Sequence, residues 1–258
     1  MLARIEHESI LELRLERPPA NALDTELLAA LRSAVEAAPA AGFEALVLSG
    51  REGLFSAGLD VPALMRLDRP GIAGLWREFF GLLRALAASP VPVAAAVTGH
   101  GPAGGAVLTL YCDYRVMAEG DFRIGLNEVR VGLSLSEAIY GPLRLLVGHR
   151  QAERLAVGGV LVPAPEALRL GLVDELAPPG AVVERALDYL RGLLALPRRA
   201  MLATRAILRA DLVRMISLDR SSEEDVVGLW FSEETQEALG ALVARLADKS
   251  AADGRKTR

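Results

Sequence analysis

Hydrophobic and polar residues alternate near the beginning of the chain. Within residues 11–16, leucine alternates with a charged residue, which predicts a half-exposed β-strand, with Ile5–Ile10 as the start of its hairpin. Asp24 then stands where it can cap a helix that continues to about Ala37, and the apolar run at Ala45–Ser49 predicts a further strand. The chain therefore begins with a hairpin and a β-α-β unit.

The same alternation continues through the middle of the chain and then gives way to helical spacing. The next expected elements are a helix at Gly71–Ala88, a strand at Val93–Val97, a helix from Ala103 and a strand at Tyr114–Ala118. Helical periodicity dominates after Glu128, with expected helices near Glu137–Leu146, His149–Ala156, Ala164–Leu170, Ala181–Ala195, Arg198–Ala210 and Glu233–Ala247. This order predicts an α/β fold in which helices cover a sheet and a mostly helical region follows.

The last expected helix carries a stripe of apolar residues. Leu239, Leu242, Val243 and Leu246 fall on one helical face. Such a stripe packs against the body of the same chain or against a sister chain, and both remain open at this point.

Composition sets the broad class of protein. The chain has 258 residues, of which 52% are hydrophobic, enough to bury a large core in one large domain or two small ones. The longest uncharged stretch, Ala85–Cys112, is interrupted by prolines and glycines, so we expect no membrane helix and no membrane partner. The charged first residues do not resemble a signal peptide, and the expected location is the cytoplasm.

Charge and the few histidines and cysteines limit the possible chemistry. The net charge is −4, with acids and bases interspersed, which gives no basic surface for nucleic acid. The single cysteine, Cys112, lies in an apolar stretch, as a buried structural cysteine would. His7, His100 and His149 stand far apart in the sequence, so we expect no metal site.

Two glycine-containing segments are the strongest signs of chemistry. Gly99–Gly105 is expected to form a glycine-rich loop between an apolar strand and a short helix, which would leave the Gly104 and Gly105 amides unpaired at the helix N-terminus. Phe55–Asp60 follows the Ala45–Ser49 strand and could direct a second amide to the same point. Two such amides can form an oxyanion hole.

The motifs FSAGLD, PAGG, CDYRV and IGLNE, in this order and spacing, resemble the crotonase (enoyl-CoA hydratase/isomerase) superfamily, most closely its Δ3,Δ2-enoyl-CoA isomerases. The resemblance extends from about Leu13 to about Leu176. It implies a crotonase-like spiral of β-β-α units in residues 1–195 and a helical trimerisation region in residues 196–258. It also implies a homotrimer or a dimer of trimers.

The resemblance further implies an acyl-CoA thioester substrate and no separate cofactor, because CoA is part of the substrate. The catalytic base would be Glu128, and the oxyanion hole would be formed by the amides of Leu59 and Gly104. The implied substrate-binding residues are Ala20, Ser56, Ala57, Gly58, Asp60, Gly105 and Asn127.

Several residues outside these motifs each allow two interpretations. Arg17 is either a phosphate contact or a solvated charge at a strand end. Leu64, Leu75, Phe79 and Leu135 either line an acyl pocket or pack in the core.

One departure from the family pattern favours a particular reaction. Hydratases of this superfamily carry a second glutamate where this chain has Val107. A single carboxylate suffices to shift a proton from C2 to C4, which predicts conversion of a 3-enoyl-CoA to a trans-2-enoyl-CoA in fatty acid degradation. The alternatives are a hydratase or thioester hydrolase that uses Glu137 or a water, and a non-catalytic acyl-CoA-binding subunit.

Overall fold

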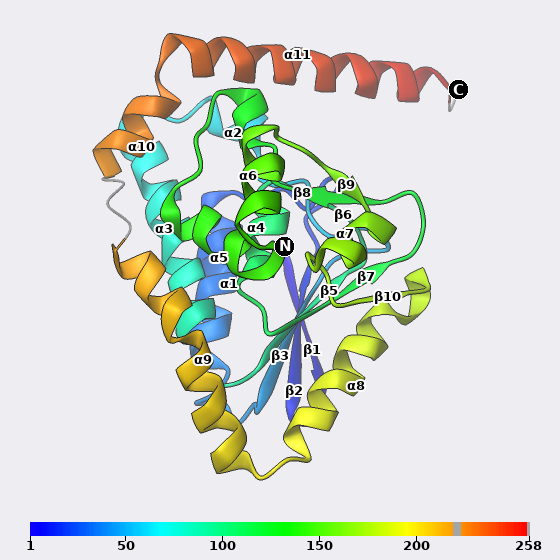
Figure 1. Cartoon of the computed structure of the whole chain (residues 1–258). Helices are drawn as coiled ribbons and strands as arrows, with labels where there is room; N and C mark the ends of the chain where they lie inside the picture. Colours follow the sequence, from blue (N-terminus) through cyan, green and yellow to red (C-terminus); the bar gives the residue numbers. More distant parts are fainter. Residues whose placement is uncertain (219–222, 257–258) are drawn as a thin grey trace.

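A computed structural model describes residues 1–218 and 223–256 (Figure 1). Within them, a six-stranded main sheet has the strand order β1-β2-β3-β5-β7-β10. Only its first pair is antiparallel, and the remaining neighbours are parallel. The strands are β1 (Leu2–His7), β2 (Ile10–Leu15), β3 (Ala45–Ser49), β5 (Val93–Val97), β7 (Tyr114–Ala118) and β10 (Glu175–Ala177).

The chain also forms a second, smaller sheet, whose strands come between those of the main sheet in the sequence. In the described part of the protein it has four strands, β4 (Gly53–Leu54), β6 (Gly99–Pro102), β8 (Arg123–Gly125) and β9 (Val162–Pro163). Three successive turns of the chain each give one strand to each sheet, as β3 and β4, β5 and β6, and β7 and β8, and then pass into a helical segment. The β-β-α spiral implied by the resemblance is therefore confirmed.

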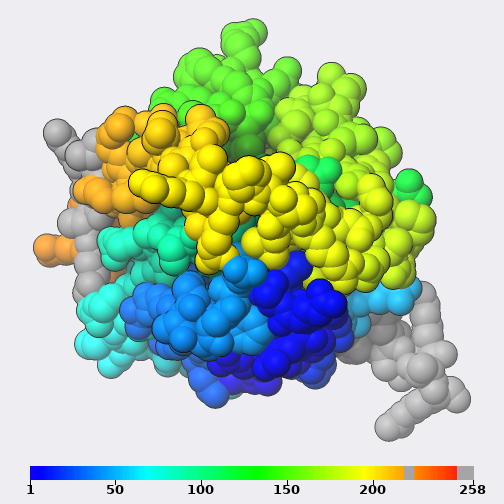
Figure 2. All heavy atoms as spheres, turned by 90° about the horizontal axis from the view of Figure 1, so that it is seen from below, coloured from blue at the N-terminus to red at the C-terminus, as the bar shows by residue number. Residues whose placement is uncertain are grey.

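The helices form layers on both sides of the main sheet. They are α1 (Thr25–Ala37), α2 (Val61–Leu64), α3 (Arg69–Ala88), α4 (Gly104–Leu110), α5 (Glu137–Val147), α6 (His149–Val157), α7 (Ala164–Leu170), α8 (Val182–Leu194), α9 (Arg198–Leu218), α10 (Glu223–Trp230) and α11 (Glu233–Lys256), with short 3-10 turns at η1 (Glu128–Val131) and η2 (Pro179–Ala181). Helix α8 covers one face of the sheet, where Val47, Ala96 and Leu187 share one apolar cluster. Figure 2 shows the yellow α8–α9 segment spread beside the blue N-terminal strands.

Most sequence-based elements are confirmed, and local chemistry explains why. Asp24 accepts a hydrogen bond from the Leu27 amide at 2.8 Å and so begins α1 as expected. The helix predicted from Arg198 continues to Leu218, and the last helix continues to Lys256. Helices α2 and α10 and strands β4, β8, β9 and β10 were not predicted.

Two local predictions are wrong. Strand β2 is not half exposed, because it lies between β1 and β3, and even the Glu12 side chain has no exposed surface. Glu12 stays ionised there: burial raises its pKa, but hydrogen bonds from Ser49, His7 and Arg14 outweigh this and lower the pKa below its usual value. The first residues of the glycine-rich segment form strand β6 and not a loop.

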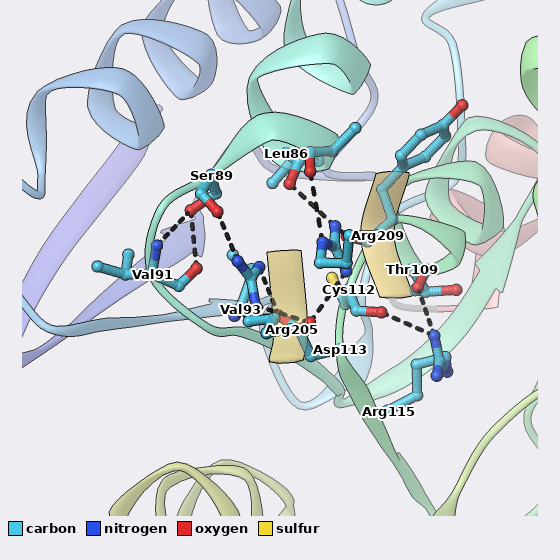
Figure 3. Close-up of polar contacts among 12 residues, drawn as sticks. Leu86, Ser89, Val91, Val93, Thr109, Cys112, Asp113, Arg115, Arg205 and Arg209 are labelled. Atoms are coloured by element: carbon cyan, nitrogen blue, oxygen red, sulfur yellow. Dashed lines mark hydrogen bonds and ion pairs between the residues drawn. The ribbon is translucent and has the colours of Figure 1, made fainter. Parts of the chain in front are cut away.

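Asp113, the residue just before β7, anchors α9 to the body of the protein (Figure 3). Its carboxylate accepts hydrogen bonds from Arg205 Nε at 2.9 Å and Arg209 Nη1 at 3.0 Å. It also accepts one from the Val93 amide at 2.7 Å, at the start of β5. Nearly buried charges paired in this way are costly to separate.

We expect Asp113→Asn to destabilise the fold by about 2 kcal/mol, because both arginines lose a charge-assisted partner. Chemical denaturation measures this change, and the matched control is Asp121→Asn at an exposed position. Equal denaturation midpoints for the two variants would show that the pairing does not anchor α9.

Candidate active site

A cavity of about 590 Å³ lies among helices from distant parts of the chain. Its lining comes from the segment before α1, from α2 and α3, from the turn into α4, from η1 and the start of α5, and from α10 and α11. Helix α11 reaches it because it packs against η1 and α2 (Figure 1).

Two backbone amides at this cavity lack acceptors. The Leu23 amide donates to Gly58 O at 2.8 Å and the Asp60 amide donates to Leu23 O at 3.0 Å, so the intervening Leu59 amide faces away from Leu23. Gly104 is the first residue of α4, where amides have no partner in the helix. Neither the Leu59 nor the Gly104 amide has an acceptor within residues 1–218 and 223–256.

Glycine permits these two amides to lie close together. A Cβ atom on Gly58 would lie 3.2 Å from Gly104 N, and one on Gly104 would lie 3.7 Å from Leu59 N. Gly58 also has a φ of +86°, which residues other than glycine rarely adopt.

Ala103 turns the chain from β6 into α4. Its φ of +49° is in the left-handed region, which costs a non-glycine residue about 1–3 kcal/mol and clusters at functional sites. The Ala103 amide is held by Gly125 O at 2.8 Å, which fixes the strained turn. The next amide, that of Gly104, is thereby left outside both the sheet and the helix.

Glu128 begins η1 in the same cavity lining. Its Oε2 atom is buried and has no hydrogen-bond partner among the described residues. Burial raises the pKa of Glu128 to about 7, against backbone hydrogen bonds from Glu128 and Asn127 that lower it. A carboxylate with a pKa near the operating pH is suited to general-base catalysis.

The structure brings most of the sequence-derived site residues together. Those that line the cavity are Ala20, Ala57, Leu59, Asp60, Gly104, Asn127 and Glu128. Ser56, Gly58 and Gly105 lie behind this lining: Ser56 Oγ donates to Asn21 O at 2.8 Å, and a Cβ on Gly105 would meet Ser56 O at 2.8 Å. These three shape the backbone around the cavity.

Arg17 also lines the cavity, but its charge is already paired. Its guanidinium lies 2.9 Å from Asp24 Oδ2 and 2.6 Å from Asp60 Oδ2. Asp60 additionally caps α2 through the Ala63 amide. These ion pairs contradict the interpretation of Arg17 as a solvated charge. Its role as a phosphate contact stays a prediction.

The apolar part of the lining was largely missed. Phe79 lines the cavity, whereas Leu64 and Leu75 are buried in the core and Leu135 packs against it. The unpredicted lining residues include Trp76, Phe80, Leu133, Ile139 and Leu229. Of the apolar stripe on the last helix, Leu239 is fully buried within its own chain and Leu242 and Leu246 line the cavity, where Leu246 is still 44% exposed.

The two positions considered for a second catalytic carboxylate, 107 and 137, lie outside the cavity. Val107 is fully buried in the core and does not line the cavity. Glu137 is exposed, pairs with Arg144 at 3.1 Å and is also outside the lining. In the part of the chain that the structure describes, no group of three or more histidine, cysteine or acidic residues is placed to hold a metal ion. No described helix is long and apolar enough to cross a membrane.

The enoyl-CoA hydratase/isomerase family model matches residues 5–247. The chain belongs to this family. A curated relative, human mitochondrial enoyl-CoA delta isomerase 1, is 32% identical over 241 residues, which cover 92% of this chain and 80% of the human one.

Solved structures of family members show the same architecture. The human mitochondrial Δ3,Δ2-enoyl-CoA isomerase superimposes with a TM-score of 0.90 at 29% identity, covering 96% of this chain and 98% of the human one. An enoyl-CoA hydratase from Mycobacterium ulcerans superimposes with a TM-score of 0.80 at 28% identity, covering 89% and 99%. Membership in the family therefore establishes enoyl-CoA thioester chemistry, and both activities occur among the relatives.

Proposed function

We propose that the protein is an enoyl-CoA isomerase that moves the double bond of a 3-enoyl-CoA to the trans-2 position. The observation that carries this proposal is the Glu128 carboxylate in the cavity lining, whose Oε2 atom is buried without a hydrogen-bond partner among the described residues, with apolar Val107 where family hydratases have a second glutamate. The cavity's other acids are Asp60, which is in an ion pair with Arg17, and Asp225, which lies exposed on α10.

The proposed mechanism uses the backbone and one side chain. The Leu59 and Gly104 amides donate to the thioester oxygen and stabilise the enolate that forms when a proton leaves C2. Glu128 removes this proton, carries it as a carboxylic acid and delivers it to C4, so the double bond shifts from C3–C4 to C2–C3. No water is consumed, and the base is regenerated.

This mechanism explains the environment of Glu128. The protonated intermediate form is neutral, and a buried site favours a neutral carboxyl group. A pKa of about 7 therefore lets the same residue accept and return a proton.

Purified protein tested separately with a 3-enoyl-CoA and a 2-enoyl-CoA distinguishes the candidate functions. The proposal predicts rapid conversion of the 3-enoyl-CoA with little hydration of the 2-enoyl-CoA. Faster hydration would support a hydratase, and tight CoA-ester binding without turnover of either would support a non-catalytic subunit.

The trimer also remains a proposal, supported by apolar residues on the outer face of α9. Ile207 and Leu208 are 75% and 73% exposed in the single chain, and exposed apolar clusters mark interaction surfaces. We expect light scattering to show a trimer or hexamer at micromolar concentration, and Ile207→Asp with Leu208→Asp to give monomers. A wild-type monomer would contradict this expectation.

The cytoplasmic location likewise remains a prediction.

A further inference from the structure

The turn that carries Glu128 contributes no buried residue to the core. Turn η1 has four residues, and none of them is buried. The chain on either side is anchored, because Leu126 and Leu133 are only 2% and 5% exposed. A segment with little apolar burial has little local stability of its own. The position of η1 therefore depends on its contacts with other elements.

The backbone hydrogen bonds of the turn close within the turn. The Leu133 amide donates to Glu128 O at 3.1 Å, and the Gly132 amide donates to Val129 O at 3.3 Å. These bonds preserve the shape of the turn but do not fix its position relative to the rest of the protein. The Gly132 carbonyl takes no part in them and is available to another element.

Thr235, in the first turn of α11, donates a hydrogen bond to that carbonyl. Its Oγ1 atom lies 2.9 Å from Gly132 O, and the residue is fully buried. Thr235 Oγ1 also accepts a hydrogen bond from Ser232 Oγ at 3.0 Å, which leaves its own proton for Gly132. The Thr235 amide donates to Ser232 Oγ at 3.3 Å. Both the backbone and the side chain of the threonine are thus held in place.

Gly132 permits α11 to approach the turn this closely. A Cβ atom at this position would lie 2.9 Å from both Thr235 Cα and Thr235 Oγ1, which is too close for a real side chain. Gly132 also has a φ of +75°, a conformation that favours glycine. The hydrogen bond between the helix and the turn therefore requires specific residues on both sides.

Helix α11 is itself anchored to the body of the protein. Thr235 lies at helical spacing from Leu239, Leu242 and Leu246, on one face of the helix. Leu239 is fully buried in the core, and Leu242 and Leu246 line the cavity. Thr235 therefore connects an anchored helix to the turn that carries Glu128.

Arg130 provides another contact between η1 and its surroundings. Its Nε atom donates to Gly159 O, after α6, at 2.6 Å. Arg130 is an exposed residue, so water competes for this contact. Thr235 has no exposed surface, and a hydrogen bond made by a buried group is stronger because the local dielectric is low. Of these two contacts, the one from Thr235 restrains the turn more firmly.

We infer that Thr235 is a positioning residue, whose hydroxyl holds the turn η1 so that Glu128 lies at the distance from the substrate that proton transfer requires. The inference rests on the proposed function, in which Glu128 must reach both C2 and C4. Loss of the hydroxyl loosens the turn, and a displacement of about 1 Å in a reacting group can lower the rate by about 10²-fold.

Thr235→Val replaces the hydroxyl with a methyl group of similar size. We expect it to lower the isomerisation kcat for 3-octenoyl-CoA by about 10–100-fold. The calorimetric Kd for octanoyl-CoA should stay near the wild-type value, because neither Thr235 nor Gly132 lines the cavity. Thr235→Ser keeps the hydroxyl and should retain most of the wild-type kcat. If the valine variant does not fold, Thr235→Ala removes the same hydroxyl without placing a methyl group against the Gly132 carbonyl.

Thr98→Val is the matched control. Thr98 is 5% exposed, and its Oγ1 atom donates to Arg51 O at 2.8 Å, so this variant also removes a threonine hydroxyl that joins two distant segments. Thr98 does not line the cavity, and its variant should lose stability but keep its kcat. A wild-type kcat in folded Thr235→Val, or an equal loss of kcat in Thr235→Ser or Thr98→Val, would overturn the inference while leaving the isomerase function intact.

The reaction of the wild-type protein separates the inference from the proposed function. If 3-octenoyl-CoA is not isomerised but 2-octenoyl-CoA is hydrated, the proposed function fails, and the same variants are compared in hydration. A kcat that is lost in Thr235→Val and retained in Thr235→Ser then still supports the inference, and equal rates overturn it. If neither substrate reacts, Glu128 has no proton transfer for Thr235 to serve, and both the function and the inference fail.

Discussion

Glu128→Gln should lower the isomerisation kcat by about 10²–10⁴-fold, the range for loss of a general base. Glutamine keeps the size of the side chain but cannot carry a proton between C2 and C4. The affinity for a saturated acyl-CoA should change little, because the Leu59 and Gly104 amides are untouched. The control is Glu137→Gln, at an exposed glutamate outside the cavity, which should keep wild-type activity.

The pH dependence of kcat/KM of the wild-type enzyme should report the titration of Glu128. Glu128 must be ionised to act as a base, so kcat/KM should fall as the pH decreases through about 7. An acid limb near pH 4.5, the ordinary value for a glutamate, would contradict the raised pKa.

Stability should depend on Glu128 in the opposite direction to activity. Between pH 4.5 and about 7 the folded chain binds more protons at Glu128 than the unfolded chain does, so this residue makes wild-type stability fall as the pH rises through that window. The full shift corresponds to about 3 kcal/mol. Chemical denaturation should therefore show Glu128→Gln gaining stability relative to wild type from pH 5 to pH 8, and a constant difference would contradict the assignment.

Gly104→Pro should lower kcat by about 10²–10³-fold, because proline removes the amide that we assign to the thioester oxygen. Gly104→Ala is the matched control, since it adds a similar Cβ near Leu23 Cδ1, at 3.1 Å, but retains the N–H. The assignment predicts a much smaller loss for alanine than for proline.

The opposite amide provides an independent variant if Gly104→Pro does not fold. Leu59→Pro removes the second N–H, and Leu59→Ala removes only the side chain. Near-normal turnover in a folded proline variant at either position would exclude that amide from the site.

The sequence predicted the main sheet, except for its last strand β10, and most helices because their signals are local. Leucine alternation and the Asp24 cap depend only on neighbouring residues. The buried state of Glu12 was not predictable in this way, because its hydrogen-bond partner Ser49 comes from the adjacent strand β3. Strand β6 was missed because its glycines are typical of loops, and its partners β4 and β8 lie far away in the sequence.

The residues of the candidate site also differ in whether short sequence motifs predict them. Glu128 and the Leu59 and Gly104 amides were found because short motifs carry them. The apolar lining was not found, because Trp76 and Leu246 come from helices far apart in the chain and meet only after folding. Helical periodicity showed that such residues are buried but not which of them face a cavity.

Transfer of an isotope label tests the single-carboxylate mechanism most directly. A 3-enoyl-CoA carrying deuterium at both C2 positions is isomerised in ordinary water, and the product is analysed by NMR and mass spectrometry. If Glu128 carries the proton within the buried cavity, part of the product should contain deuterium at C4. Product formed at wild-type rate without deuterium at C4 would contradict the proposed shuttle.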